Sequence, residues 1–99
     1  VAIMIPVFGS SPKKALHAAD LANVRAVYAE ELTNAMANDM KVDAATGAVT
    51  VSVDAGPIKA AAKNNSTVTC VDKTSITVTL GDISEVIPVD GDVTFTNNN

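Results

Sequence analysis

The fold of this chain is decided by residues 12–40, which read PKKALHAADLANVRAVYAEELTNAMANDM. Alanine is abundant in this stretch and neither proline nor glycine occurs after Pro12, so the intrinsic helix propensity is high. Ser11 and Pro12 suit the N-cap and the first position of a helix. We therefore predict a helix from Pro12 to Met40, about 40 Å long at 1.5 Å per residue. Its apolar side chains recur every three or four residues: Leu16, Leu21, Val24, Val27, Tyr28, Leu32, Ala35, Met36 and Met40.

The pattern changes after Met40 to strict alternation. Aliphatic residues occupy one side of each alternating segment, and Thr or Ser occupies the other. A sheet with one buried and one solvated face is typical of antiparallel pairing. Asp90-Gly91 predicts a two-residue hairpin turn, and residues 56–63 predict a short helix with Pro57 at its first position. The segments with clear alternation are 49–53, 68–70, 76–80 and 93–96.

The sheet needs an apolar partner, and the helix stripe is the available one. These elements predict an α+β fold in which a long N-terminal helical stem packs on a small antiparallel sheet. The chain divides into the end of an apolar stem with helix breakers (1–12), an amphipathic stem helix (13–40) and a β-sheet head (41–99). The expected core between stem and head contains Val27, Leu32, Met36, Val51, Cys70, Ile76, Val78, Val93 and Phe95.

The composition argues against several functions. A net charge of −4 and a pI near 4.6 disfavour nucleic-acid binding by an overall positive field. The single cysteine excludes an internal disulfide, and we read Cys70 as a small buried hydrophobe. The single histidine, His17, reads as a solvated residue on the helix surface. No nucleophile, base or metal-ligand spacing is present, so we expect neither an enzyme nor a cofactor.

The first eight residues, VAIMIPVF, are apolar but too few to span a bilayer as a helix. We interpret them as the end of a longer apolar segment that polymerises by packing against other copies; a short strand or a tail is the alternative. Helix breakers follow, and they predict a bent, extended or melted segment unless the helix continues with a kink. The polymerising residues would be Val1, Ile3, Met4, Ile5, Val7 and Phe8. The breakers are Pro6, Gly9, Ser10, Ser11 and Pro12.

The segment Ala2-Ile3-Met4-Ile5-Pro6, followed by an alanine-rich helix and a Thr/Val-rich sheet, resembles the type IV pilins and the related pseudopilins. Residues 20–30, DLANVRAVYAE, are similar to the stem of pilins from Gram-positive bacteria. The paired head cysteines of many Gram-negative pilins are missing. The processed, methylated N-terminal residue of the family would precede Val1. The calcium loop common in major pseudopilins has no counterpart.

This resemblance implies a structural subunit of a filament at the bacterial cell surface. The subunit would lie in the cytoplasmic membrane before assembly, would be polymerised by pilus assembly machinery and would bind copies of itself. Two alternatives remain open. One is a pseudopilin of a secretion or competence system, and the other is a monomeric α+β module for surface binding or adhesion.

Charged residues on the helix offer a way to set the register of such a filament. Lys14 and Arg25 precede Glu30 and Glu31, so staggered parallel stems could pair Arg25 of one subunit with Glu30 or Glu31 of another; a solvated polar face is the alternative.

Two smaller motifs are interpreted as connections between strands and not as ligand sites: one as a turn and the other as a loop. Asp90-Gly91-Asp92 has too few carboxylates for calcium. Residues 64–67, Asn-Asn-Ser-Thr, match the N-glycosylation pattern and are read as a loop.

Overall fold

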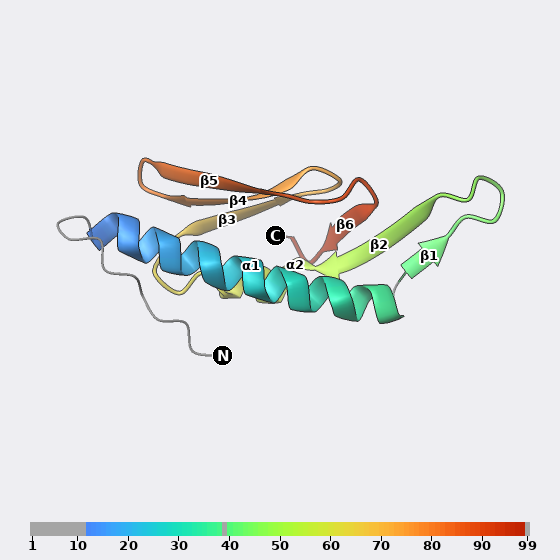
Figure 1. Ribbon diagram of the computed structural model, residues 1–99, viewed down its shortest axis with the longest axis horizontal. Helices are drawn as coiled ribbons and strands as arrows, with labels where there is room; N and C mark the ends of the chain where they lie inside the picture. Colours follow the sequence, from blue (N-terminus) through green and yellow to red (C-terminus); the bar gives the residue numbers. More distant parts are fainter. Residues whose placement is uncertain (1–11, 39, 99) are drawn as a thin grey trace.

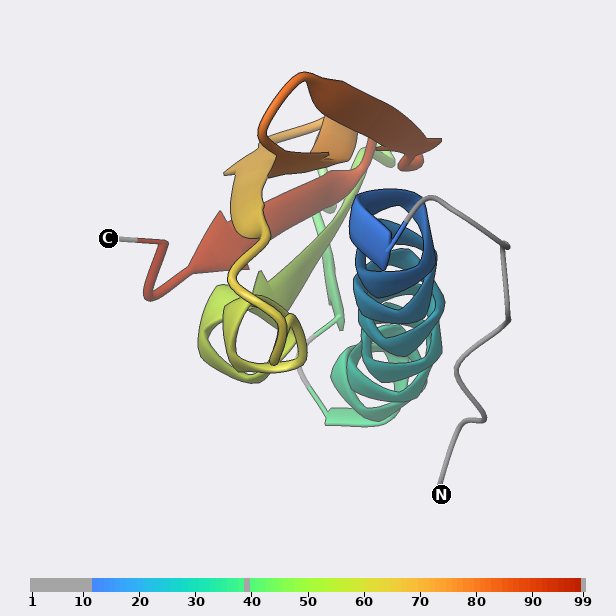
Figure 2. The same cartoon turned by 90° about the vertical axis from the view of Figure 1, so that its left-hand side faces the viewer.

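The computed structural model describes residues 12–38 and 40–98. It has an α+β architecture, in which one long helix packs on two small three-stranded sheets (Figure 1). The helix α1 runs beneath both sheets, and the short helix α2 lies beside it (Figure 2). The elements are α1 (Pro12–Asn38), β1 (Met40–Val42), β2 (Val49–Asp54), α2 (Ala55–Ala60), β3 (Thr67–Val71), β4 (Ser75–Leu80), β5 (Ile83–Pro88) and β6 (Val93–Thr96).

Helix α1 begins at Pro12, as the sequence predicts, and contains 27 residues. It ends at Asn38, so the prediction that it continues to Met40 was wrong. Met40 instead begins strand β1, where its backbone pairs with Val51 of β2. The backbone of Met40 is therefore part of the β1–β2 pairing and not of a longer helix.

The first sheet has the order β1–β2–β6, and its two pairings differ in direction. Strands β1 and β2 are antiparallel, whereas β2 and β6 are parallel with Val51 beside Val93 and Val53 beside Phe95. The expectation of a purely antiparallel sheet was therefore wrong. Parallel neighbours need a long crossover connection, and here it consists of α2 and the whole second sheet.

The second sheet has the order β3–β4–β5 and is antiparallel throughout. Its strands β3 and β4 correspond to predicted segments, whereas the pairing of β5 was not predicted. The Asp90-Gly91 hairpin was also wrong. Val93 N does donate to Asp90 O at 3.1 Å, but this turn leads from β5 in one sheet to β6 in the other.

Helix α2 begins earlier than predicted. The Asp54 carboxylate accepts a hydrogen bond from Gly56 N at 2.9 Å, so Asp54 is the N-cap. Pro57 is consequently the third helical residue and not the first, a place where proline is still tolerated because the N–H groups of the first turn lack helical partners.

The turn between β3 and β4 connects the two sheets. Phe95 N donates to Asp72 Oδ1 at 2.8 Å, and Lys73 N donates to Val93 O at 2.7 Å. Both bonds satisfy backbone groups of β6, which would otherwise be an open sheet edge. The sheets and α1 therefore share one core.

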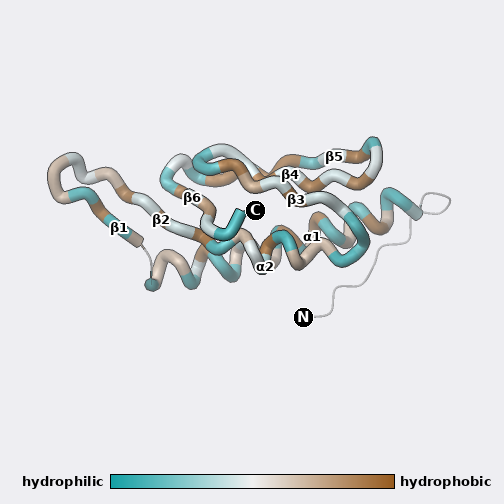
Figure 3. Tube along the Cα trace, turned by 180° about the vertical axis from the view of Figure 1, so that it is seen from behind, coloured by the Kyte–Doolittle hydropathy of each residue, from teal (hydrophilic) through white to brown (hydrophobic). Residues whose placement is uncertain are grey.

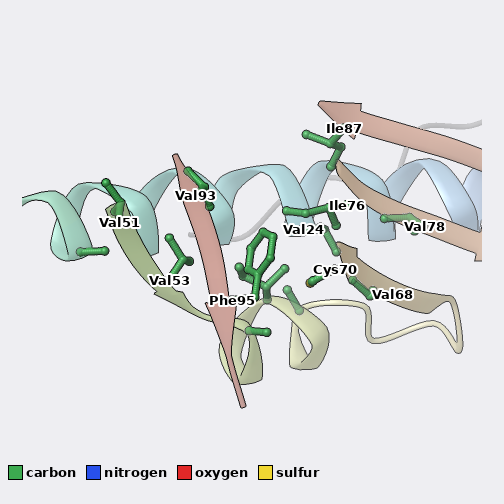
Figure 4. Packing of buried hydrophobic residues seen from close by; sticks show 14 residues of the cluster. Val24, Val51, Val53, Val68, Cys70, Ile76, Val78, Ile87, Val93 and Phe95 are labelled. Atoms are coloured by element: carbon green, nitrogen blue, oxygen red, sulfur yellow. The ribbon is translucent and has the colours of Figure 1, made fainter. Parts of the chain in front are cut away.

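Valine and isoleucine side chains from both sheets dominate this core (Figure 4). Val24 of α1, Val53 of β2 and Ile58 of α2 are completely buried, as are Ile76 and Val78 of β4. Coloured by hydropathy, the strands alternate between apolar and polar residues along their length (Figure 3). Each fully buried aliphatic side chain stabilises the fold by about 1.5–3 kcal/mol.

Candidate functional site

The second half of α1 has a side that its own sheets do not cover. We call this surface the outer face of α1. The opposite side, with Val24 and Ala35, is buried against the sheets. The outer face is composed of the exposed residues Arg25, Ala26, Ala29, Glu30, Thr33, Met36 and Ala37.

Three of the four residues expected to form intersubunit charge pairs are exposed. Lys14 and Arg25 are eleven residues apart, about three helical turns, and so point to the same side of α1. Glu30 is also exposed, and Glu31 is half-buried at the flank. The one salt bridge formed among residues 12–38 and 40–98 joins Lys13 to Asp82 at 3.2 Å. The four charged side chains are therefore not paired with one another within the described fold.

Small side chains lie between these charges. Ala26, Ala29 and Thr33 are exposed and project little from the helix. The distance between two packed helices depends on the side chains at their contact and is about 8–10 Å. The geometry thus allows a second helix to approach this surface closely while charged side chains meet at its margins.

The expected stem–head core is placed as follows. Val51, Cys70, Ile76, Val78, Val93 and Phe95 are buried, and Val27 and Leu32 are partly buried against them. Met36 was expected in this core, but 53% of it is exposed, so that expectation was wrong. Ala35 takes the buried position at this turn of the helix, which rotates Met36 toward solvent.

Two polar residues of α1, His17 and Asp20, are buried, although neither was predicted to be. His17 is only 4% exposed, which corrects the reading of a solvated surface histidine. Its Nε2 donates to the carbonyl of Val78 at 2.9 Å, since a carbonyl can only accept. Asp20 is completely buried. The only signal in the sequence was that residues 17, 20 and 24 share one side of a helix.

Asp20 holds the loop that connects α2 to β3. Its Oδ1 accepts from Asn64 N at 3.0 Å and from Asn64 Nδ2 at 3.1 Å, and its Oδ2 accepts from Ser66 N at 3.2 Å. A buried carboxylate needs such donors because its desolvation is costly. This group is therefore bound on both oxygens and is structural.

The remaining reactive side chains are shielded. Burial raises the pKa of the Cys70 thiol, which keeps it in the less nucleophilic protonated form. Burial and the nearby carboxylates of Asp90 and Asp92 raise the pKa of Tyr28, whose ring packs beside that of Phe95 with centroids 6.4 Å apart. Both groups are therefore protonated at neutral pH.

Within residues 12–38 and 40–98, no three His, Cys, Asp or Glu side chains are grouped so that they could hold a metal ion. None of the described helices combines the length and the apolar character needed to cross a bilayer. The expected polymerising residues and the breakers from Pro6 to Ser11 lie outside the described residues, whereas Pro12 is the first residue of α1.

Comparison with known proteins found no match among family models, curated proteins or solved structures.

Proposed function

We propose that this chain is the structural subunit of a type IV pilin-like surface filament. The observation that carries the proposal is the outer face of α1, a helical surface that belongs to a 27-residue helix and is not covered by the subunit's own sheets. The apolar segment from Val1 to Phe8 precedes this helix in the sequence, with Gly9, Ser10 and Ser11 between them. The apolar segment calls for a partner outside the subunit, and the outer face of α1 is free to receive one.

A repeated contact between copies of one chain explains both features together. An apolar segment in water is unfavourable by about 25 cal/mol per Å² of exposed apolar surface. Packing it against the stems of neighbouring copies removes that cost. When each copy uses one surface to bind a different surface of the next, the contact does not close and a filament results.

The charges of α1 would then fix the stagger between neighbouring stems. Arg25 and Glu30 are exposed and are separated by five residues, about 7.5 Å along the helix axis. Two parallel stems shifted by that distance would bring Arg25 of one copy beside Glu30 of the next. Exposed pairs contribute only about 0–1 kcal/mol each, so they favour a register more than they stabilise the polymer.

The setting that follows from this proposal is the bacterial cell surface. The apolar segment would reside in the cytoplasmic membrane before assembly, and pilus assembly machinery would move the subunit from the membrane into the filament. The partners are then copies of the same chain. The net charge of −4 makes nucleic acid an unfavourable partner because phosphate is also negative.

Electron microscopy of the protein isolated from the membrane, with any residues that precede Val1, tests this proposal. We expect thin filaments by negative staining and a pelletable fraction on ultracentrifugation when detergent is removed. The matched control is residues 12–99, which retain every described element and should stay monomeric with an unchanged thermal unfolding midpoint. A membrane-derived protein that stays monomeric without detergent would refute the proposal, as would equal fibre formation by the control.

A second candidate is a monomeric surface-binding module, and the second sheet favours it. On the side away from the core, Thr67 of β3 lies beside Thr79 of β4, which lies beside Ser84 of β5, and Thr69 lies beside Thr77. This regular array of hydroxyl and methyl groups is a surface on which a flat ligand could lie. Size-exclusion chromatography distinguishes the candidates, since the module predicts a monomer at every concentration.

A further inference from the structure

The loop between α2 and β3 contains two overlapping copies of the N-glycosylation pattern Asn-X-Ser/Thr. The first is Asn64-Asn65-Ser66 and the second is Asn65-Ser66-Thr67. Each needs a free asparagine amide and an accessible hydroxyl two residues later. The sequence alone does not distinguish them, but the environment of their side chains does.

The first pattern faces the interior. The side-chain amide of Asn64 donates to Asp20 Oδ1 at 3.1 Å, and Asp20 is completely buried. The hydroxyl of Ser66 is buried as well and has no hydrogen-bond partner among the described residues. Both groups that a transferase would have to reach are therefore turned toward α1.

The second pattern faces solvent. Asn65 is exposed, and its φ of 69° places it in the left-handed region at the tip of the loop. Thr67, the first residue of β3, is exposed too. The same bonds from Asp20 to Asn64 and Ser66 hold the residues on either side of Asn65 and so keep its side chain outside.

We propose that Asn65 is an acceptor for N-linked glycosylation and that Asn64 is not. The donor would be a lipid-linked oligosaccharide diphosphate. Nδ2 of Asn65 forms a bond to the anomeric carbon of the first sugar while the bond from that carbon to the diphosphate oxygen breaks. The lipid diphosphate leaves with the electron pair, and Nδ2 gives one proton to a base of the transferase.

The position of Asn65 is compatible with assembly but does not depend on it. Its anchor, Asp20, precedes Arg25 by five residues and so points about 140° away from it around the helix axis. A glycan beside Asp20 would leave the outer face of α1 free. The proposal requires only that a transferase can reach the loop, so its test is independent of filament formation.

Two single substitutions separate the patterns without touching either asparagine. Ser66→Ala removes the hydroxyl of the first pattern, keeps the Ser66 N–H bond to Asp20 and leaves the second pattern intact. Thr67→Val removes the hydroxyl of the second pattern with little change in volume and leaves the first intact. Neither hydroxyl makes a hydrogen bond within the described residues, so both variants should fold, as circular dichroism can verify.

The folded wild-type chain and both variants are incubated with a single-subunit oligosaccharyltransferase that reads Asn-X-Ser/Thr and with its lipid-linked donor. Peptide mass spectrometry of residues 64–73 then gives the occupancy. We expect modification at Asn65 in the wild type, occupancy within twofold of it in Ser66→Ala, and at least a tenfold loss in Thr67→Val. An unmodified wild-type chain, modification at Asn64, or a loss in Ser66→Ala in place of Thr67→Val would overturn the proposal.

Discussion

Asp20 is a fully buried carboxylate in a chain of only 99 residues, and its environment explains how the fold tolerates it. It replaces water with three hydrogen bonds, of which two come from backbone N–H groups of the α2–β3 loop. A hydrogen bond to a charged group contributes about 1.5–3 kcal/mol, and an unsatisfied buried donor costs a comparable amount. One side chain of α1 thus fixes a loop 44 residues away in sequence.

We predict that Asp20→Asn destabilises the chain by about 3 kcal/mol, because an amide NH₂ would replace one acceptor and face a donor N–H. Denaturant unfolding followed by circular dichroism measures the loss. Asp82→Asn is the control: the Asp82 side chain is exposed and forms a surface ion pair with Lys13, so the midpoint of this variant should stay near that of the wild type. Equal midpoints for the Asp20→Asn variant and the wild type would contradict the structural role assigned to Asp20.

The sequence did not reveal these buried polar residues for a physical reason. His17 and Asp20 lie in a helix that is rich in charged and small residues, where a polar side chain is ordinarily solvated. Their partners, Val78 and Asn64, are 61 and 44 residues away. Short-range spacing carries no information about such contacts.

Helices and strands were more predictable than their neighbours in space. Periods of 3.6 and 2 residues reflect the local backbone, so α1 and the strands β2, β3, β4 and β6 could be recognised from the pattern. The direction in which β2 and β6 pair is not encoded in that alternation, since each strand buries only one face and so alternates as an antiparallel strand does. The parallel pair depends on the crossover through the second sheet.

The side of α1 that faces the sheets was the feature least well predicted from the spacing of apolar residues. Successive residues differ by about 100° around a helix, so exchanging Met36 for Ala35 at the interface is a rotation of one residue. In the structure Val24 is fully buried and Met36 is mostly exposed. The outer face of α1 follows directly from this rotation.

Paired substitutions test the rotation. We predict that Val24→Ala lowers the free energy of unfolding by about 2 kcal/mol, because it leaves a cavity between α1 and the sheets. Met36→Ala should change it by less than about 0.5 kcal/mol, because Met36 is 53% exposed and outside the core. Denaturant titration of the two variants gives both values. A larger loss for Met36→Ala than for Val24→Ala would mean that another side of α1 faces the core.

The molecule as a whole is elongated, with principal extents of 56 × 26 × 20 Å, and α1 runs along its length. The sheets cover one side of the helix, and the hairpin of β1 and β2 projects past its end (Figure 1). Such a shape offers a long lateral surface for neighbours. The charges along that surface therefore provide the most direct test of how copies would be arranged.

We predict that Arg25→Glu weakens filament assembly and that Arg25→Glu combined with Glu30→Arg restores it. The single change removes an attraction of about 0.5 kcal/mol and adds a repulsion of similar size, about 1 kcal/mol together, which should raise the critical concentration for assembly about fivefold. Lys41→Glu is the control, because it changes the net charge equally but lies on β1, beyond the end of α1 (Figure 1). Ultracentrifugation at a series of protein concentrations gives the critical concentration of each variant.

Salt provides a second comparison on the same samples. At 1 M salt the screening length falls to about 3 Å, so the difference between Arg25→Glu and the wild type should shrink if it is electrostatic. Restoration by the double variant at low salt, with little effect of Lys41→Glu, would identify Arg25 and Glu30 as partners across the contact. If the double variant assembles no better than Arg25→Glu, Arg25 does not meet Glu30, and the stagger of about 7.5 Å between stems is wrong.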